Sequence, residues 1–212
     1  MYFKKNIKFN IIDSKTDLTN FFKSKSFKNV ILPGGNTLNF ILDSLINFRK
    51  SINIILTDER INFNKKKKLN SIKFLKIKKL NDKLNFLLDG EYISNAQIIE
   101  KFINQFKKLD KKKSLFLFGM GSDGHICSIF NNIQINTKFF ISKKKNENFK
   151  RITISTNYIN SFETFYLIGF GSKKGHLFNK ILENNFISPI KKLKLTRLRI
   201  ICDKSFYKQI KI

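Results

Sequence analysis

The chain has 212 residues, of which 42% are hydrophobic, and this suits one domain over residues 1–212 that buries about 70% of its unfolded surface. Lys and Arg number 42 against 15 Asp and Glu, so the formal net charge is +27 and the field of the protein attracts anions. Two cysteines exclude a disulfide framework, and the absence of an 18-residue apolar run or a signal-peptide core predicts a cytoplasmic protein without a membrane partner.

Short apolar runs bounded by polar residues predict seven strands along the chain. Their expected bounds are Ile7–Ile12, Asn29–Leu32, Ile52–Leu56, Leu115–Phe118, Arg151–Ser155, Phe165–Phe170 and Arg199–Cys202. The polar segment Asn131–Lys150 has no clear pattern, and we expect it to be a surface excursion.

Three-four spacing of apolar residues predicts helices between several of these strands. One spans Leu38 to Phe48, a second begins at the capping box Ser94-Asn-Ala-Gln97, and a third spans Lys174–Glu183 and ends at Asn184-Asn185. Strands that alternate with helices predict an α/β fold, a single-domain, mostly parallel, doubly wound sheet flanked by helices on both faces. Open sheets of this kind bind ligands at the carboxyl ends of their strands.

The first loop of interest is Leu32-Pro-Gly-Gly-Asn-Thr37, which follows a strand and opens a helix. Its glycines let backbone N–H groups approach an anion at a helix N-terminus, and Asn36 and Thr37 add side-chain donors. A plain strand-to-helix turn with Asn36 or Thr37 as the N-cap fits equally well. The patterns of a dinucleotide fingerprint and of a Walker loop are both incomplete.

The second is Leu56-Thr-Asp-Glu-Arg60, which directly follows another apolar run. Arg60 can hold a phosphate or carboxylate through two parallel hydrogen bonds. The alternative is a surface ion pair with Asp58 or Glu59, which would stabilise little. Because only five of the 42 basic residues are Arg, the presence of one here favours the functional interpretation.

The third is Leu115-Phe-Leu-Phe-Gly-Met-Gly-Ser-Asp-Gly-His125, a buried strand followed by a glycine-rich turn. His125 is one of only two histidines and can act as a general base toward water, with Asp123 orienting its ring. The alternative is a loop histidine with a purely structural role. No further ligand stands at metal-binding spacing, so we expect no metal, and Ser122 lacks the Gly-x-Ser-x-Gly pattern of a nucleophile.

The three loops together carry a family resemblance that none carries alone. Pro33-Gly-Gly-Asn-Thr-Leu38, Thr57-Asp-Glu-Arg60 with Leu69-Asn70, and Gly119-Met-Gly-Ser-Asp-Gly-His-Ile-Cys-Ser-Ile-Phe130 are similar, in order and spacing, to the motifs of the 6-phosphogluconolactonase family. Arg151-Ile-Thr-Ile-Ser155 and Gly171-Ser-Lys-Lys174 match two later segments. The resemblance runs from about Asn29 to Asp203 and places the chain within a larger group that includes glucosamine-6-phosphate deaminases.

The resemblance implies metal-independent hydrolysis of 6-phospho-D-glucono-1,5-lactone to 6-phosphogluconate, with no cofactor. It implies that His125 activates water and that Asp123 assists it. The substrate and its phosphate are expected to bind Gly34, Gly35, Asn36, Thr37, Asp58, Arg60, Arg151 and Lys174. Asn36, Leu38 and Thr57 depart from the family pattern, which has Ser, Pro and Gly at these places.

Two alternatives remain at this stage, besides a non-catalytic member of the same family. Deaminases of the group continue Asp-Gly-His as Ile-Ala-Phe-Asn-Glu-Pro, whereas this chain continues as Ile126-Cys-Ser-Ile-Phe130. A basic nucleic-acid-binding domain would explain the charge, but the 37 lysines are spread along the chain, as an AT-rich genome would also produce. We expect a small sugar-phosphate lactone as partner, no specific nucleic acid, and a monomer or homodimer.

Overall fold

The computed structural model describes residues 2–4, 6–34, 41–42, 44–45, 51–61, 70, 84–86, 94–107, 109–130 and 136–211. The strands are β1 (Tyr2–Lys4), β2 (Ile7–Ile11), β3 (Asn29–Leu32), β4 (Ile52–Leu56), β5 (Asp58–Ile61), β6 (Leu84–Phe86), β7 (Ser114–Gly119), β8 (Phe139–Ser142), β9 (Lys150–Ile154), β10 (Phe165–Gly169) and β11 (Leu198–Cys202). The α-helices are α1 (Lys15–Lys23), α4 (Asn95–Asn104), α5 (Thr156–Ile159), α6 (Ser172–Leu182) and α7 (Lys204–Tyr207). The described residues also form the short 3-10 helices η2 (Lys111–Lys113), η3 (Pro189–Lys192) and η4 (Leu195–Arg197).

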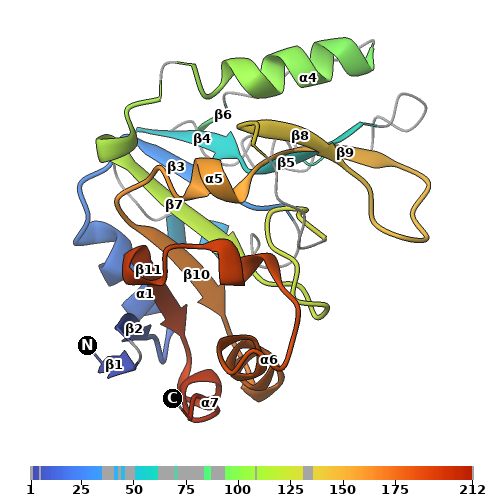
Figure 1. Cartoon of the computed structure of the whole chain (residues 1–212). Coiled ribbons are helices and arrows are strands. Elements are labelled where there is room, and N and C mark those ends of the chain that lie inside the picture. The colour runs from blue at the N-terminus through green and yellow to red at the C-terminus, as the bar shows by residue number, and fades with distance from the viewer. Residues whose placement is uncertain are drawn as a thin grey trace.

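The main sheet has eight described strands in the order β1-β2-β11-β10-β7-β3-β4-β6. All neighbours pair in parallel except β1 and β2, so the predicted mostly parallel α/β architecture is confirmed. From β3 the chain winds outward through β4 to β6, then returns to β7 and winds the other way through β10 to β11 (Figure 1). The direction of winding therefore switches between β3 and β7.

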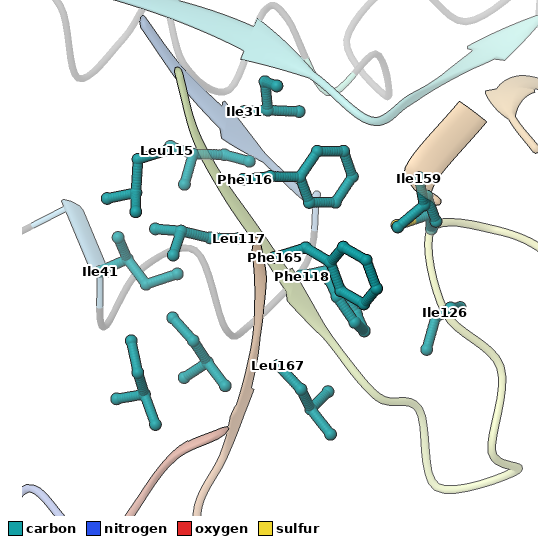
Figure 2. Close-up of a cluster of buried hydrophobic side chains, with 14 of the residues drawn as sticks. Ile31, Ile41, Leu115, Phe116, Leu117, Phe118, Ile126, Ile159, Phe165 and Leu167 are labelled. Atoms are coloured by element: carbon teal, nitrogen blue, oxygen red, sulfur yellow. The ribbon is translucent and has the colours of Figure 1, made fainter. Parts of the chain in front are cut away.

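Continuous apolar runs explain why these strands lie at the centre of the molecule. A parallel strand covered on both faces has no polar side to expose, and β7 buries four consecutive side chains from Leu115 to Phe118. Figure 2 shows these side chains with Ile31 of β3, and with Phe165 and Leu167 of β10, in one apolar cluster. The predicted strand positions are confirmed to within one or two residues.

The predicted helices are confirmed where the structure describes them. The Ser94–Gln97 capping box is present at the start of α4, and α6 ends where Asn184 takes a left-handed backbone (φ 65°). Residues 41–42 and 44–45 of the helix predicted from Leu38 to Phe48 are helical, and the rest of that range lies outside the described residues. Helix α1, which the sequence analysis missed, also has a capping box, formed by Ser14 and Asp17.

A second sheet, which the sequence did not predict, stands beside the first (Figure 1). It contains β5, β9 and β8, paired antiparallel in that order. The expectation of one sheet was therefore wrong for Arg151–Ser155, and the supposed excursion Asn131–Lys150 contains β8. Single-strand periodicity cannot distinguish the two sheets, because it reports which side chains are buried and not which strand lies alongside.

Aromatic rings attach this small sheet to the rest of the molecule. Phe139 of β8 contacts Phe102 and Phe106 of α4, at ring-centroid distances of 6.1 and 5.2 Å. Tyr158 of α5 closes the group against Phe106 and Phe139, at 5.4 and 5.5 Å. Such pairs add a directional preference to ordinary apolar burial. The cluster therefore fixes the small sheet in place.

Helix α6 is held against α7 by an unusually close backbone approach. A Cβ added at Gly175 would lie 2.4 Å from the carbonyl oxygen of Phe206 and 2.9 Å from its Cα. Phe178 also packs on Phe206, at a ring-centroid distance of 5.8 Å. Since backbone atoms cannot move aside as a side chain can, a glycine is needed at this position.

We therefore predict that Gly175→Ala destabilises the protein. In an ordinary exposed helix this change stabilises by about 1 kcal/mol, but here the added methyl group should cost about 1–3 kcal/mol. Urea denaturation followed by circular dichroism measures the difference. Lys180→Ala, at an exposed position of the same helix, is the control and should lie within about 0.5 kcal/mol of wild type. A Gly175→Ala protein as stable as this control would contradict the prediction.

Candidate active site

A cleft of about 350 Å³ opens at the carboxyl ends of β3 and β7, where the winding of the sheet switches direction. Loops that leave neighbouring strands in opposite directions cannot fill the space between them, so such a switch point leaves a crevice. The described residues lining it are Pro33, Gly34, Asp58, Arg60, Asn70, Gly119, Met120, Gly121, Ser122, His125, Cys127, Ser128, Arg151 and Lys174.

The turn after β7 is compact and leaves no room for larger residues. The Gly121 N–H donates to the His125 carbonyl oxygen at 2.9 Å, and the Gly124 N–H donates to the Gly121 carbonyl oxygen at 3.1 Å. A Cβ at Gly121 would lie 2.3 Å from the His125 ring, and Gly124 has the left-handed φ of +74° that favours glycine. From outside the turn, the buried Ser188 hydroxyl donates to the Gly124 carbonyl oxygen at 2.6 Å. The turn is therefore held on both sides.

Asp123 and His125 face each other across this turn. His125 Nδ1 contacts Asp123 Oδ1, and Lys144 Nζ lies 2.9 Å from the other carboxylate oxygen, Oδ2. Partial burial opposes ionisation of Asp123, but hydrogen bonds and charges from Lys144 and His125 outweigh it and hold the pKa of Asp123 well below its usual range. An ionised Asp123 that accepts from Nδ1–H leaves the other ring nitrogen, Nε2, without a proton in the neutral imidazole. That nitrogen is the one a general base would use.

The floor of the cleft is built around the buried carboxylate of Asp58. Its Oδ1 accepts from the Thr57 hydroxyl at 2.9 Å and its Oδ2 from the Ser128 hydroxyl at 2.7 Å. Asn70 Nδ2 donates to the Asp58 carbonyl oxygen at 3.3 Å, and its backbone N–H donates to Glu59 Oε1 at 2.7 Å. A buried carboxylate is tolerated only when donors surround it in this way.

Two consecutive non-glycine residues adopt left-handed backbone beside this carboxylate. Cys127 has φ 46° and Ser128 has φ 59°, a conformation that costs roughly 1–2 kcal/mol for each residue. The Ser128–Asp58 hydrogen bond and a hydrogen bond from the Thr153 hydroxyl to the Cys127 carbonyl oxygen hold them there. Burial, followed by the nearby charge of Asp58, raises the pKa of the Cys127 thiol well above its ordinary value and so disfavours its thiolate form.

Arg60 and Arg151 are opposite each other on the antiparallel pair β5–β9. Phe149 lies between them, with its ring centroid 5.0 Å from the Arg60 guanidinium carbon and 4.4 Å from that of Arg151. Arg151 is buried and pairs with Glu147 at 2.5 Å. Like charges placed directly opposite repel, so a bound anion would be favoured here.

Lys174 reaches the same cleft from the first turn of α6. Its helix starts at Gly171 (φ +88°), whose N–H donates to both Asp203 carboxylate oxygens at 3.1 Å. Desolvation by burial lowers the pKa of Lys174 below its usual value. The cleft therefore receives three cationic side chains from three separate elements.

The structure brings together six of the ten predicted site residues at the cleft. These are His125, Arg60, Arg151, Lys174, Gly34 and Asp58. Asp123 lies directly behind His125, and Asp58 lines the cleft floor but is already engaged by protein donors. Gly35, Asn36 and Thr37 lie outside the described residues.

Sequence reasoning missed Ser128, Lys144 and Phe149. Ser128 stands within the Gly119–Phe130 motif, but its hydrogen-bonding partner is 70 residues away in the sequence. Lys144 is one of many lysines, and nothing in its own neighbourhood marks it. Across the residues that the structure describes, no group of three or more His, Cys, Asp or Glu side chains could hold a metal ion.

Comparison with known proteins gives three kinds of match. A family model described as glucosamine-6-phosphate isomerases/6-phosphogluconolactonase matches residues 13–201. A probable 6-phosphogluconolactonase from Dictyostelium discoideum is 28% identical over 182 residues, covering 76% of each chain. The solved structure of a 6-phosphogluconolactonase from Plasmodium vivax matches with a TM-score of 0.72 at 17% identity, over 99% of this chain and 95% of that one.

A solved monomeric glucosamine-6-phosphate deaminase matches almost as well. Its TM-score is 0.70 at 14% identity, over 96% of this chain and 100% of that one. At such low identity these structural likenesses show the fold alone, and the fold hosts both chemistries.

We predict that Asp123 contributes to stability in a pH-dependent way. A carboxyl group whose pKa is depressed in the folded state stabilises above its unfolded pKa, near 3.8, and this contribution is lost as the pH falls through the folded value. Wild type should therefore exceed Asp123→Asn in free energy of unfolding by a constant amount at pH 5–7, and the difference should shrink below about pH 4. Urea denaturation at several pH values measures it. A difference that stays constant down to pH 3 would contradict the depressed pKa.

Proposed function

The chain belongs to the family of glucosamine-6-phosphate isomerases and 6-phosphogluconolactonases, and on that premise we propose that it hydrolyses 6-phospho-D-glucono-1,5-lactone to 6-phosphogluconate. The observation that carries the proposal is the His125 imidazole, held through Nδ1 by Asp123 at the wall of a cleft that also receives Arg60, Arg151 and Lys174. A positioned base and an excess of cationic side chains suit an uncharged ester group carried on a phosphorylated sugar.

The reaction needs only a base and a positioned water. A lactone is an activated ester, so direct attack by water can replace a covalent nucleophile. As the water oxygen bonds to C1, one water proton passes to Nε2 of His125, and the former carbonyl oxygen becomes an oxyanion. The bond between C1 and the ring oxygen then breaks, and the imidazolium returns the proton to that oxygen. Asp123 stabilises the imidazolium between the two steps.

The oxyanion would be stabilised by donors that the turn after β7 leaves available. The Gly121 N–H does not qualify, because it already donates to the His125 carbonyl oxygen. Donors of this kind act only if they are aimed at the oxyanion before the reaction starts. The fixed shape of the turn is therefore part of the proposal.

The phosphate would bind at the cationic side of the cleft. We assign it to Arg60 and Lys174, with Arg151 beside them and with Gly34, Gly35, Asn36 and Thr37 as backbone and side-chain donors. The antiparallel pairing of β5 and β9 supports this, because it places two guanidinium groups opposite each other at the cleft. The role of Asp58 is to hold Ser128 and Asn70 in place, since both of its carboxylate oxygens accept hydrogen bonds from the protein.

Nothing in the site favours the deaminase alternative, although the fold is compatible with it. The chain lacks the Asn-Glu-Pro continuation after Asp-Gly-His, and residues 126–130 instead turn back through Cys127 and Ser128 to Asp58.

Binding to nucleic acid is expected to be weak and salt-sensitive. A cytoplasmic location and a monomeric or homodimeric state stay predictions; no helix in the described part of the chain is long and apolar enough to cross a membrane.

We predict that His125→Ala abolishes most of the lactonase activity. Loss of a general base should lower kcat by about 10²–10⁴-fold, because water must then attack without transfer of its proton. The assay generates the lactone with glucose 6-phosphate dehydrogenase, detects the product with 6-phosphogluconate dehydrogenase, and subtracts spontaneous hydrolysis.

His176→Ala is the matched control, since His176 is the only other histidine and is exposed on α6. It should behave as wild type. Full activity in His125→Ala would remove His125 from the role of base. If folded wild-type protein does not exceed the spontaneous rate, the proposed function fails, and ammonia release from glucosamine 6-phosphate becomes the next assay.

We predict that Arg60→Ala weakens binding of the phosphorylated lactone selectively. Loss of a charge-assisted hydrogen bond should raise KM by roughly 10–100-fold. Hydrolysis of glucono-1,5-lactone, which has no phosphate, should change little. Lys150→Ala, which removes an exposed positive charge from the same small sheet, is the control. Equal losses on both lactones would place Arg60 away from the phosphate.

A further inference from the structure

The segment that joins β8 to β9 contacts the catalytic turn although it is far from it in sequence. A tight turn forms where the Glu147 N–H donates to the Lys144 carbonyl oxygen at 3.2 Å, and Asn146 takes the left-handed φ of 67° that such turns need. Lys144 and Glu147 are the first and last residues of this turn. Both are partly buried, whereas the two residues between them are exposed.

The inward side chains of this segment reach two functional groups of the cleft. Lys144 Nζ lies 2.9 Å from Asp123 Oδ2. Glu147 pairs with Arg151. Lys144 also lies over the ring of Phe130, 5.7 Å from its centroid, and the same ring packs on His125 at 4.8 Å. Lys144 thus touches both the partner of the catalytic imidazole and the ring on which that imidazole packs.

We propose that Lys144 is a positioning residue for the Asp123–His125 pair. A carboxylate has two oxygens, and a single contact with the imidazole leaves it free to rotate about its own axis. Lys144 binds Oδ2 and so fixes Oδ1 toward Nδ1, which in turn aims Nε2 into the cleft. The inference rests on the proposed function for its kinetic consequence but not for its structural one.

The charge of Lys144 has a second effect on the same pair. A cation beside Asp123 opposes the appearance of a further positive charge on His125. The other charged side chains near the site are Arg151, stacked on Phe130, its partner Glu147, and the cleft-lining Asp58, Arg60 and Lys174. All of these are unchanged when Lys144 is replaced, so removal of its charge should make His125 easier to protonate.

Exposed ion pairs often contribute nothing measurable, and the two side chains here are 38% and 42% exposed. The second contact, with Phe130, distinguishes this lysine from an ordinary surface pair. Lys144 is also absent from the described residues that line the cleft. A positioning role therefore predicts an effect on kcat, whereas a role in binding the phosphate would appear in KM.

The test compares Lys144→Ala with Lys145→Ala in the full-length protein. Both variants lose one positive charge from the same turn, but Lys145 is exposed. The first readout is an NMR titration of the imidazole signals, which needs no activity; the chain has only two histidines, and His176 is the internal reference. In Lys144→Ala the titration midpoint of His125 should rise by roughly half a pH unit relative to Lys145→Ala.

The second readout is the pH profile of lactone hydrolysis. The acid limb of kcat/KM should move to higher pH by the same amount in Lys144→Ala, kcat should fall roughly threefold, and KM should stay within about twofold. Lys144→Arg, which keeps the charge and the reach, should restore both readouts.

Equal His125 midpoints in the two alanine variants would overturn the inference, as would a loss confined to KM. If the His125 midpoint differs between the two alanine variants but the wild-type protein does not hydrolyse the lactone, the role of Lys144 stands and the proposed function fails.

Discussion

Buried Asp58 is the point at which three segments of the site meet. The Asp58 carboxylate accepts a hydrogen bond from the Ser128 hydroxyl, in the segment after His125. The Asn70 side chain donates to the backbone carbonyl oxygen of Asp58. Asp58 also stands at the start of β5, where the chain leaves the main sheet for the small one. A buried carboxylate without donors would cost several kcal/mol, so burial of Asp58 favours the arrangement that places the Ser128 hydroxyl beside it. The left-handed backbone at Cys127 and Ser128 is tolerated for the same reason.

The two sheets have different roles. The main parallel sheet is an apolar scaffold whose switch between β3 and β7 creates the cleft. The small antiparallel sheet brings Arg60 and Arg151 to that cleft. The turn between its strands β8 and β9 reaches Asp123 through Lys144. Because aromatic rings of α4, β8 and α5 fix the small sheet in place, the positions of the charged groups depend on apolar packing some distance from the chemistry.

The family shares this scaffold among different reactions on phosphorylated sugars, as the near-equal structural matches to a lactonase and a deaminase illustrate. The fold accordingly accounts for where substrate binds and not for which bond breaks. In this chain the segment after His125 turns back toward Asp58, and the His125 imidazole lies at the cleft wall with Asp123 as its partner.

The sequence by itself determined the strands, the α/β class and the glycine-rich turn after β7, because these depend on short-range patterns. Apolar runs such as Leu115–Phe118 must be buried, and the glycines beside Asp123 and His125 allow a sharp turn that other residues would disfavour. Tertiary structure alone decided that β5, β8 and β9 form a second sheet and that Lys144 meets Asp123. Such pairings depend on which segments lie side by side after folding, and no periodicity within one segment encodes its neighbour. One lysine among 37 acquires its role only from the carboxylate that folding places beside it.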